Sequence, residues 1–361
     1  MNHYNPVRIV FKPIESVINY IEKGKSYLVV SSFGADRRGF LDVFKTNHRD
    51  FKFHIITNTK SNPDLSDLEG LQSQIPADLR AFDGVIGLGG GSVIDTAKYL
   101  AFRMINSGRI IDSLFDEDIS SLEIFRSLPL IAIPTTAGTG SEVTQFATVW
   151  DLVNSRKLSI TGESLFPKLA LIDKKLLNTL DDDNLLYPAL DALSHSLDSI
   201  WNKNCSPLTR PLSIESMHYT LEGLQILCKN GSTEEGRSKL QIGSILAGLA
   251  ISQTRTSAAH AFSYQFTYNY GVPHGLACSV PLFFLLEKYH ERITTNESEK
   301  ILFCSVRDLL LDLNLLKRLN EFVDHLVFDD NLNQSRLSNF LFTDSDLYND
   351  FKNYVSTSFT S

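Results

Sequence analysis

Short, unbroken runs of apolar residues recur through the first half of the chain, with stretches of helical spacing between them. Four of these runs are Ser26–Ser32, Phe53–Thr57, Gly84–Leu88 and Pro129–Ile133. Polar residues do not recur at every second position, so the runs are typical of strands in a parallel sheet that is covered on both faces. Strands that alternate with helices form βαβ units. The sequence therefore predicts an α/β N-terminal domain with a doubly wound, mostly parallel sheet.

The strand pattern fades near residue 180, and helical spacing replaces it. Apolar positions recur at helical intervals in Leu212–Lys229, Arg237–Ser252, Val280–His290 and Leu309–Val327. At 361 residues the chain is long enough for two domains, each with its own core. We expect the α/β domain to cover residues 1–178 and an all-α C-terminal domain to cover residues 179–361.

The composition excludes several classes of protein. A content of 43% hydrophobic and 21% charged residues is that of a soluble globular protein. The formal net charge is −8 and no stripe of Lys and Arg is present, which argues against a nucleic-acid partner. The 4 cysteines lack CxxC spacing, which argues against a zinc finger or a disulfide framework. Residues 1–25 lack the pattern of a signal peptide, and no apolar run is long enough to cross a bilayer. We therefore expect a cytoplasmic protein with no membrane partner.

A glycine-rich turn joins one of the predicted strands to a predicted helix. Gly89-Gly90-Gly91-Ser92 lies between Gly84–Leu88 and the helix Val93–Met104. Glycines allow the backbone to approach a phosphate, and the N–H groups and dipole of a helix start favour its negative charge. A tight turn without a ligand explains the glycines equally well. The turn is not a G-x-G-x-x-G motif after the first strand, so it does not predict a standard Rossmann domain.

Four possible metal ligands lie in the predicted helical half. Asp191 and His195 are four residues apart, which places both side chains on one face of a helix. His260 and His274 flank a segment of aromatic and small residues. One carboxylate and three imidazoles are sufficient to bind a divalent transition metal and leave room for water or substrate. Any one of these residues alone is more typical of a structural histidine or a capping aspartate.

Several motifs together resemble the iron-containing (group III) alcohol dehydrogenase family. They are Asn62-Pro63, GLGGGSVIDTAK at 87–98, PTTAGTGSEVT at 134–144, DALSH at 191–195 and VPHG at 272–275. The resemblance extends from about residue 8 to about residue 290. It implies the dehydroquinate synthase-like fold of that family, a dinucleotide site in the α/β domain, and a metal and substrate site in the helical domain.

The resemblance also implies which residues bind the dinucleotide. In the family the glycine turn holds the pyrophosphate, and residues of the following helix and the next two loops complete the site. The corresponding residues are Asn62, Gly89, Gly90, Gly91, Ser92, Asp95, Lys98, Thr135, Thr136, Thr139 and Lys157. Ser32 corresponds to the residue that faces the adenosine ribose, where an acidic side chain favours NAD. Arg37 and Arg38 follow it, and they either accept the 2′-phosphate of NADP or are surface charges. We therefore expect NAD(P) as the cofactor.

The metal ligands of the family correspond to Asp191, His195, His260 and His274. This donor set suits Fe(II), and it also accepts Zn(II), Mn(II), Co(II) or Ni(II). The family name suggests iron. The resemblance implies that the cation polarises a carbonyl oxygen as hydride arrives from the nicotinamide.

Two departures from the family pattern concern the substrate. Tyr264 replaces a histidine that many relatives have four residues after the third ligand, and Arg255 replaces a glycine. We predict that Tyr264 donates a proton or hydrogen bond and that Arg255 binds an anionic group of the substrate. The motifs look most like the branch of phosphonoacetaldehyde reductases. Pairing of Arg255 with an acidic neighbour is the alternative.

The predicted function is thus a metal-dependent, NAD(P)-linked alcohol dehydrogenase or aldehyde reductase that acts on a small molecule, in a homodimer. Two other functions remain open. One is a lyase similar to dehydroquinate synthases, and the other is a non-catalytic relative that binds only the nucleotide.

Overall fold

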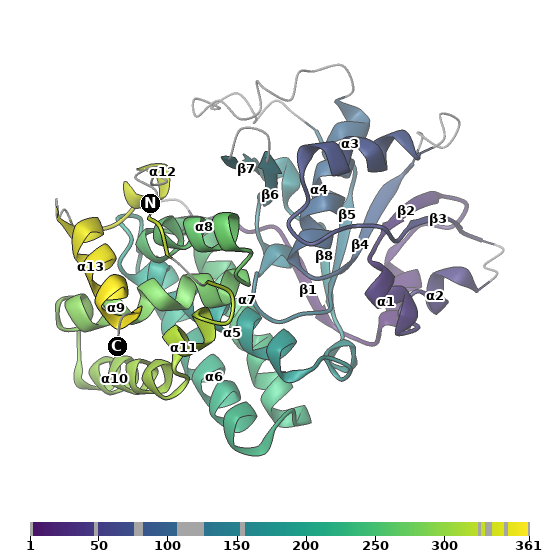
Figure 1. Cartoon of the computed structure of the whole chain (residues 1–361). Helices are drawn as coiled ribbons and strands as arrows, with labels where there is room; N and C mark the ends of the chain where they lie inside the picture. Colours follow the sequence, from purple (N-terminus) through teal and green to yellow (C-terminus); the bar gives the residue numbers. More distant parts are fainter. Residues whose placement is uncertain are drawn as a thin grey trace. The chain divides into compact units, whose positions relative to one another are not determined.

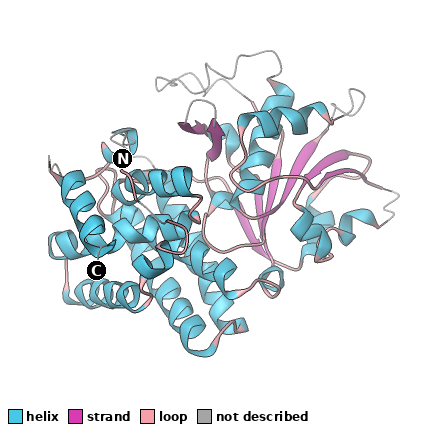
Figure 2. Cartoon of the chain, in the orientation of Figure 1, coloured by secondary structure: helices cyan, strands magenta, loops and turns pink. Residues whose placement is uncertain are grey.

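The computed structural model describes residues 3–46, 50–75, 82–106, 126–151, 156–323, 326–328, 334–342 and 346–359. The chain forms two compact units. The α/β unit comprises Asn5–Thr136 and Ser141–Thr179, and the helical unit comprises Met1–Tyr4, Ala137–Gly140 and Leu180–Ser361. Strands occur mainly in the first unit, and helices make up most of the second (Figure 2).

A six-stranded sheet forms the centre of the α/β unit (Figure 1). Its strand order is β1-β8-β5-β4-β2-β3, and every neighbouring pair is parallel. The strands are β1 (Arg8–Phe11), β2 (Ser26–Val30), β3 (Lys52–Ile56), β4 (Gly84–Gly89), β5 (Leu130–Pro134) and β8 (Leu169–Ile172). The prediction of a doubly wound parallel sheet, followed by a helical domain, is confirmed.

Two hydrophobic clusters cover the two faces of this sheet. Along β2, Leu28 and Val30 face one cluster and Val29 faces the other, as the alternation of a strand requires. The first cluster is completed by α3 (Leu65–Ser73) and α4 (Gly91–Ile105). The second is completed by the 3-10 helices η1 (Ile14–Tyr20) and η7 (Lys174–Leu177) and by α2 (Asp42–Lys45).

Several boundaries in this unit differ from the predictions. The strand predicted over Ser26–Ser32 ends at Val30, because Ser32 instead caps the short helix α1 (Phe33–Arg37) by accepting a hydrogen bond from the N–H of Ala35. The helix before β2, η1, is a 3-10 helix rather than an α-helix. An antiparallel hairpin of β6 (Phe146–Asp151) and β7 (Arg156–Thr161) was not predicted. The short 3-10 helices η5 (Ser141–Val143) and η6 (Glu163–Leu165) flank this hairpin.

The helical unit contains α5 (Asp182–Ile200), α6 (Thr209–Asn230), α7 (Glu234–Thr254), α8 (Ala258–Tyr270), α9 (His274–Ile293), α10 (Glu297–Asp312), α11 (Leu315–Leu319), α12 (Gln334–Leu337) and α13 (Leu347–Phe359). The prediction of a single helix over Leu309–Val327 is wrong. Helix α10 ends at Asp312, because Asn314 adopts the left-handed conformation with φ 48°. Among the described residues, no helix combines the length and the apolar character needed to span a bilayer.

Candidate metal centre

Helix α5 carries two of the predicted metal ligands in its buried middle. Asp181 caps the helix by accepting a hydrogen bond from the N–H of Asn184 at 2.8 Å, and acidic residues in the first turn complement the helix dipole. Asp191 and His195 lie one turn apart and are only 3% and 6% exposed. A buried carboxylate of this kind needs a partner to offset its loss of solvation.

His260 lies in the first turn of α8, and Asp198 of α5 holds that turn in place. The carboxylate of Asp198, which is fully buried, accepts hydrogen bonds from the N–H groups of Ser257, Ala259 and His260. Its Oδ2 lies 2.8 Å from His260 Nδ1. Because an ionised carboxylate can only accept, Nδ1 of His260 carries a proton, and Nε2 is the nitrogen that can bind a cation.

His274 begins α9, and the glycine after it allows α9 to approach α5. A Cβ atom at Gly275 would lie 1.7 Å from the carbonyl oxygen of Tyr187 and 3.1 Å from the backbone nitrogen of Asp191. Only glycine fits at so short a distance, which explains the Gly of the VPHG motif. The close approach brings the His274 ring beside Asp191, with a side-chain exposure of 26%.

The four predicted ligands converge on one point. Oδ1 of Asp191 lies 3.6 Å from Nε2 of His195, 3.3 Å from Nε2 of His260 and 3.9 Å from Nε2 of His274. The rings of His195 and His260 stack at 4.7 Å, and the ring of His274 meets that of His260 edge-on at 5.4 Å. Three imidazole nitrogens thus surround one carboxylate oxygen.

The donor atoms at this point fit a divalent cation. Oδ1 of Asp191 and Nε2 of His260 are both buried and have no hydrogen-bond partner. Two such orphaned acceptors would cost roughly 1–3 kcal/mol each, unless a ligand satisfies them. A carboxylate and imidazoles are the donors that Fe(II) and Zn(II) bind.

The charge states of the site also suit a cation. Burial raises the pKa of the Asp191 carboxyl, but its interactions with the three neighbouring imidazoles, of which that with His195 is the largest, outweigh this effect and hold the pKa well below its usual range. Burial lowers the pKa of His195 to about 4, so its imidazole is neutral at pH 7. The hydrogen bond from His260 overcomes burial and lowers the pKa of Asp198 to about 2. The site therefore combines two carboxylates with at least one neutral imidazole.

The glycine turn of the α/β unit lies at the carboxyl ends of β4 and β5. Gly90 is the N-cap of α4, and the N–H of Thr135 donates to the carbonyl oxygen of Gly89 at 2.9 Å. The N–H of Asn62 donates to Oγ of Ser92 at 3.1 Å. A Cβ at Gly90 would lie 3.1 Å from Oγ1 of Thr136. In this sheet the strand order reverses between β2 and β4, beside the glycine turn, and α/β proteins bind nucleotides at such a point.

Comparison with known proteins places both units in one family. Residues 6–174 match the model of the iron-containing alcohol dehydrogenase family, and residues 186–337 match the model of its C-terminal domain. The chain belongs to the iron-containing alcohol dehydrogenase family.

Individual relatives agree with this assignment. Alcohol dehydrogenase 4 of Schizosaccharomyces pombe is 28% identical over 271 residues, which cover 74% of this chain and 62% of the relative. Phosphonoacetaldehyde reductase of Streptomyces viridochromogenes is 33% identical over 211 residues, which cover 58% of this chain and 53% of the relative. The matches thus span less than two thirds of these relatives. A crystal structure of an iron-containing alcohol dehydrogenase superposes with a TM-score of 0.81 at 26% identity and covers 98% of each chain. Iron as the metal of the family was therefore predicted correctly.

Some predicted cofactor residues of this family member make internal contacts. Lys98 is 1% exposed, and its Nζ donates to the carbonyl oxygens of Thr144 and Phe146 at 2.9 and 2.7 Å. Oδ2 of Asp95 accepts from the N–H of Thr148 at 2.9 Å. Both residues thereby hold α4 against the first half of β6 and the loop before it. Their contact with a nucleotide stays a prediction.

The remaining predicted cofactor residues lie in three different places. Ser32 follows β2, the neighbour of β4 in the sheet. Thr139 belongs to Ala137–Gly140, the segment that groups with the helical unit. Lys157 lies in β7, opposite Trp150, and its side chain is outside the described residues. Arg37 is exposed, and the guanidinium of Arg38 lies 5.0 Å from the ring centre of Phe40. The choice between NAD and NADP therefore stays open.

Arg255 and Tyr264, the two residues predicted to contact substrate, lie in different elements. Arg255 caps the C-terminus of α7 with φ 62° and ψ 177°, so it does not share a helix with His260. This backbone conformation is close to glycine-only. Tyr264 lies one turn after His260 on α8 and is half-buried.

Two residues at the centre were not predicted from the sequence. Asp198, which orients His260, is seven residues after Asp191 and shares its face of α5. That spacing was the available signal. Cys278 lies one turn after His274 on α9, and its Sγ is 3.7 Å from Nε2 of His274.

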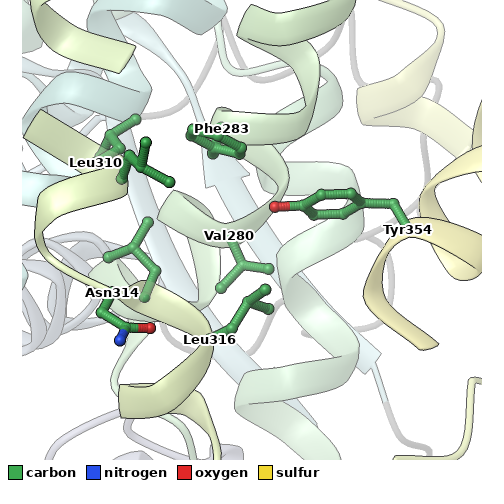
Figure 3. A pocket seen from close by; sticks show the side chains of 8 residues that line it. Val280, Phe283, Leu310, Asn314, Leu316 and Tyr354 are labelled. Carbon is green, nitrogen blue, oxygen red and sulfur yellow. The ribbon is translucent and has the colours of Figure 1, made fainter. Parts of the chain in front are cut away.

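A separate hollow in the helical unit does not contain any of these residues (Figure 3). It is lined mainly by apolar side chains, including Val280, Phe283, Leu310 and Leu316, and the hydroxyl of Tyr354 points toward them from one side. Its volume is about 70 Å³. Pockets for small molecules usually exceed roughly 300 Å³, so we regard this hollow as a packing feature.

Proposed function

We propose that this chain is a metal-dependent, NAD(P)-linked alcohol dehydrogenase or aldehyde reductase. The observation that carries the proposal is the convergence of Asp191, His195, His260 and His274 on one point, where two buried polar atoms have no hydrogen-bond partner. These four residues would hold the cation, with iron favoured by the family. When bound, the cation supplies Lewis acidity toward a carbonyl oxygen.

The protein side chains have distinct tasks in this proposal. Asp198 keeps the proton of His260 on Nδ1, so that Nε2 faces the centre. Residues of the glycine turn, together with Asn62, Thr135 and Thr136, would bind the pyrophosphate of the dinucleotide through N–H and hydroxyl groups. Tyr264 would donate the proton that the product alcohol needs. Relatives named as NAD-dependent and as NADPH-dependent both match the chain, so we propose NAD(P) without choosing between them.

We further propose that the substrate is an anionic aldehyde, with phosphonoacetaldehyde as the first candidate. Two relatives carry names of this type: phosphonoacetaldehyde reductase at 33% identity and a sulfoacetaldehyde reductase of Bilophila wadsworthia at 30%. Burial, and then the nearby charge of Arg336, lower the pKa of Arg255. Two guanidinium groups that repel each other would be stabilised by a phosphonate or sulfonate. The strained backbone of Arg255 also suggests that its side chain is retained for function.

The test combines metal analysis with oxidation of NADH and NADPH. The metal-loaded protein should oxidise one of them when phosphonoacetaldehyde, lactaldehyde or a plain aliphatic aldehyde is added. The Arg255→Ala variant should lose roughly 2–4 kcal/mol in kcat/KM for the phosphonate and little for the neutral aldehydes. Arg255→Lys keeps the charge without the planar fork and is the matched control. An equal loss for all three aldehydes would exclude the anionic substrate, and turnover without nicotinamide oxidation would exclude the dehydrogenase. A cytoplasmic homodimer stays a prediction from the sequence.

A further inference from the structure

The thiol of Cys278 lies among the proposed metal ligands. Cys278 is fully buried on α9, one turn after His274. Its Sγ lies 3.7 Å from Nε2 and 3.8 Å from Nδ1 of His274. One donor atom from each of Asp191, His260, His274 and Cys278 can be chosen so that all four lie within 4.8 Å of one another. The sulfur is therefore part of the same cluster of donors.

Two of the distances between these donors match coordination of one ion. With zinc, bond lengths of about 2.3 Å to sulfur and about 2.1 Å to nitrogen at a tetrahedral angle place the two donors about 3.6 Å apart. The Sγ of Cys278 is 3.7 Å from Nε2 of His274. The same construction places an oxygen and a nitrogen donor about 3.4 Å apart, and Asp191 Oδ1 is 3.3 Å from His260 Nε2.

A second observation shows that this position is built for a ligand. Oδ1 of Asp191 and Nε2 of His260 belong to residues that are each 3% exposed, and both atoms lack a hydrogen-bond partner. Asp191 and His260 both belong to the donor group that includes Cys278. A buried cysteine often serves only as a small apolar side chain. Here, however, both ring nitrogens of His274 lie within 4 Å of its sulfur.

We propose that the Sγ of Cys278 is an additional ligand of the metal, beside the carboxylate of Asp191 and the imidazoles. This inference rests on the proposed metal centre and extends its ligand set. When the ion binds, the S–H bond breaks, the sulfur keeps the electron pair that forms the metal bond, and the proton leaves to solvent. A soft thiolate favours zinc, cobalt and iron over manganese, so Cys278 biases the choice of metal.

Cobalt substitution tests this ligand directly, because a cobalt–thiolate bond absorbs in the near ultraviolet by charge transfer from sulfur. The metal-free full chain is loaded with Co(II) in three forms: wild type, Cys278→Ser and Cys228→Ser. Cys228 is exposed on α6 and serves as the matched control. We expect the band in the wild type and in Cys228→Ser, and cobalt binding without the band in Cys278→Ser. The variant should also lose roughly tenfold or more in zinc affinity, with a smaller loss for manganese.

Other outcomes contradict the proposal in distinguishable ways. Cobalt bound by the wild type without the band shows that Cys278 is not a ligand, while the metal centre itself stands. A band that persists in Cys278→Ser likewise shows that Cys278 is not a ligand. No cobalt binding by the wild type overturns the metal centre and this ligand together. If Cys278→Ser does not fold, X-ray absorption of the zinc-loaded wild type decides, because a sulfur ligand gives a shell at about 2.3 Å.

Discussion

Replacing Asp198 by Asn tests how the protein prepares His260 for the metal. The carboxylate accepts six hydrogen bonds, three on each oxygen. Oδ1 accepts from Trp201 Nε1, Ser257 Oγ and the N–H of Ala259, and Oδ2 accepts from the N–H groups of Ser257 and His260 and from His260 Nδ1. An asparagine has the same shape but only one acceptor oxygen.

The cost of Asp198→Asn follows from this geometry. If the amide nitrogen takes the place of Oδ1, the indole N–H of Trp201 and the N–H of Ala259 lose their acceptor. If it takes the place of Oδ2, the N–H groups of Ser257 and His260 lose theirs. At roughly 1–3 kcal/mol for each buried, unsatisfied donor, the metal-free protein should lose roughly 2–6 kcal/mol of unfolding free energy. In the second orientation His260 also shifts its proton to Nε2, the atom that faces the centre.

Two measurements separate the effects of Asp198→Asn on folding and on the metal. Urea unfolding of the metal-free protein reports the stability. Competition with a coloured chelator reports the metal affinity, which should fall by about 10–100-fold. Asp181→Asn is the matched control, since it makes the same change on the same helix at an exposed N-cap that accepts Asn equally well. A metal affinity of Asp198→Asn equal to that of Asp181→Asn would refute the role assigned to Asp198.

Three further predictions concern packing, pH and strain. Gly275→Ala should lower the unfolding free energy by about 3 kcal/mol or more and weaken metal binding, because its Cβ would lie 1.7 Å from the carbonyl oxygen of Tyr187. A urea unfolding curve close to that of the wild type would contradict this packing. Burial raises the pKa of Glu142 from its usual 4.5 to about 7, so its contribution to stability is present below pH 4.5 and is lost as the pH rises through 7. Between pH 4.5 and 7, the unfolding free energy of Glu142→Gln should therefore rise by roughly 3 kcal/mol relative to that of the wild type. A difference in unfolding free energy that does not change with pH would contradict this prediction. Arg255→Gly should be about 1–3 kcal/mol more stable than Arg255→Ala, since φ is 62° and ψ is 177°; equal thermal midpoints would show that the backbone there is not strained.

The sequence predicts the elements of this fold well where one local signal dominates. The ends of β4 and β5 differ from the predicted ends by one residue, because unbroken apolar runs mark buried parallel strands. The break after Asp312 was missed, since the apolar spacing continues through Asn314 and only the left-handed backbone there ends the helix.

The centre is predictable in part for a similar reason. Asp191 and His195 share a helix, so their spacing alone indicates one face. The meeting of α8 and α9 with α5 depends on Asp198 and Gly275, whose contacts exist only after the helices pack. Cys278 has no CxxC spacing, so its approach to His274 is visible only in the folded chain.

Anomalous X-ray scattering at the iron edge from crystals of the iron-loaded protein tests the central claim most directly. We predict one strong peak among Asp191, His195, His260 and His274, at about 2.0–2.2 Å from the oxygen and nitrogen donors. A protein loaded with iron that has no peak at this position, or whose peak lies elsewhere, would contradict the metal centre and the dehydrogenase function that depends on it.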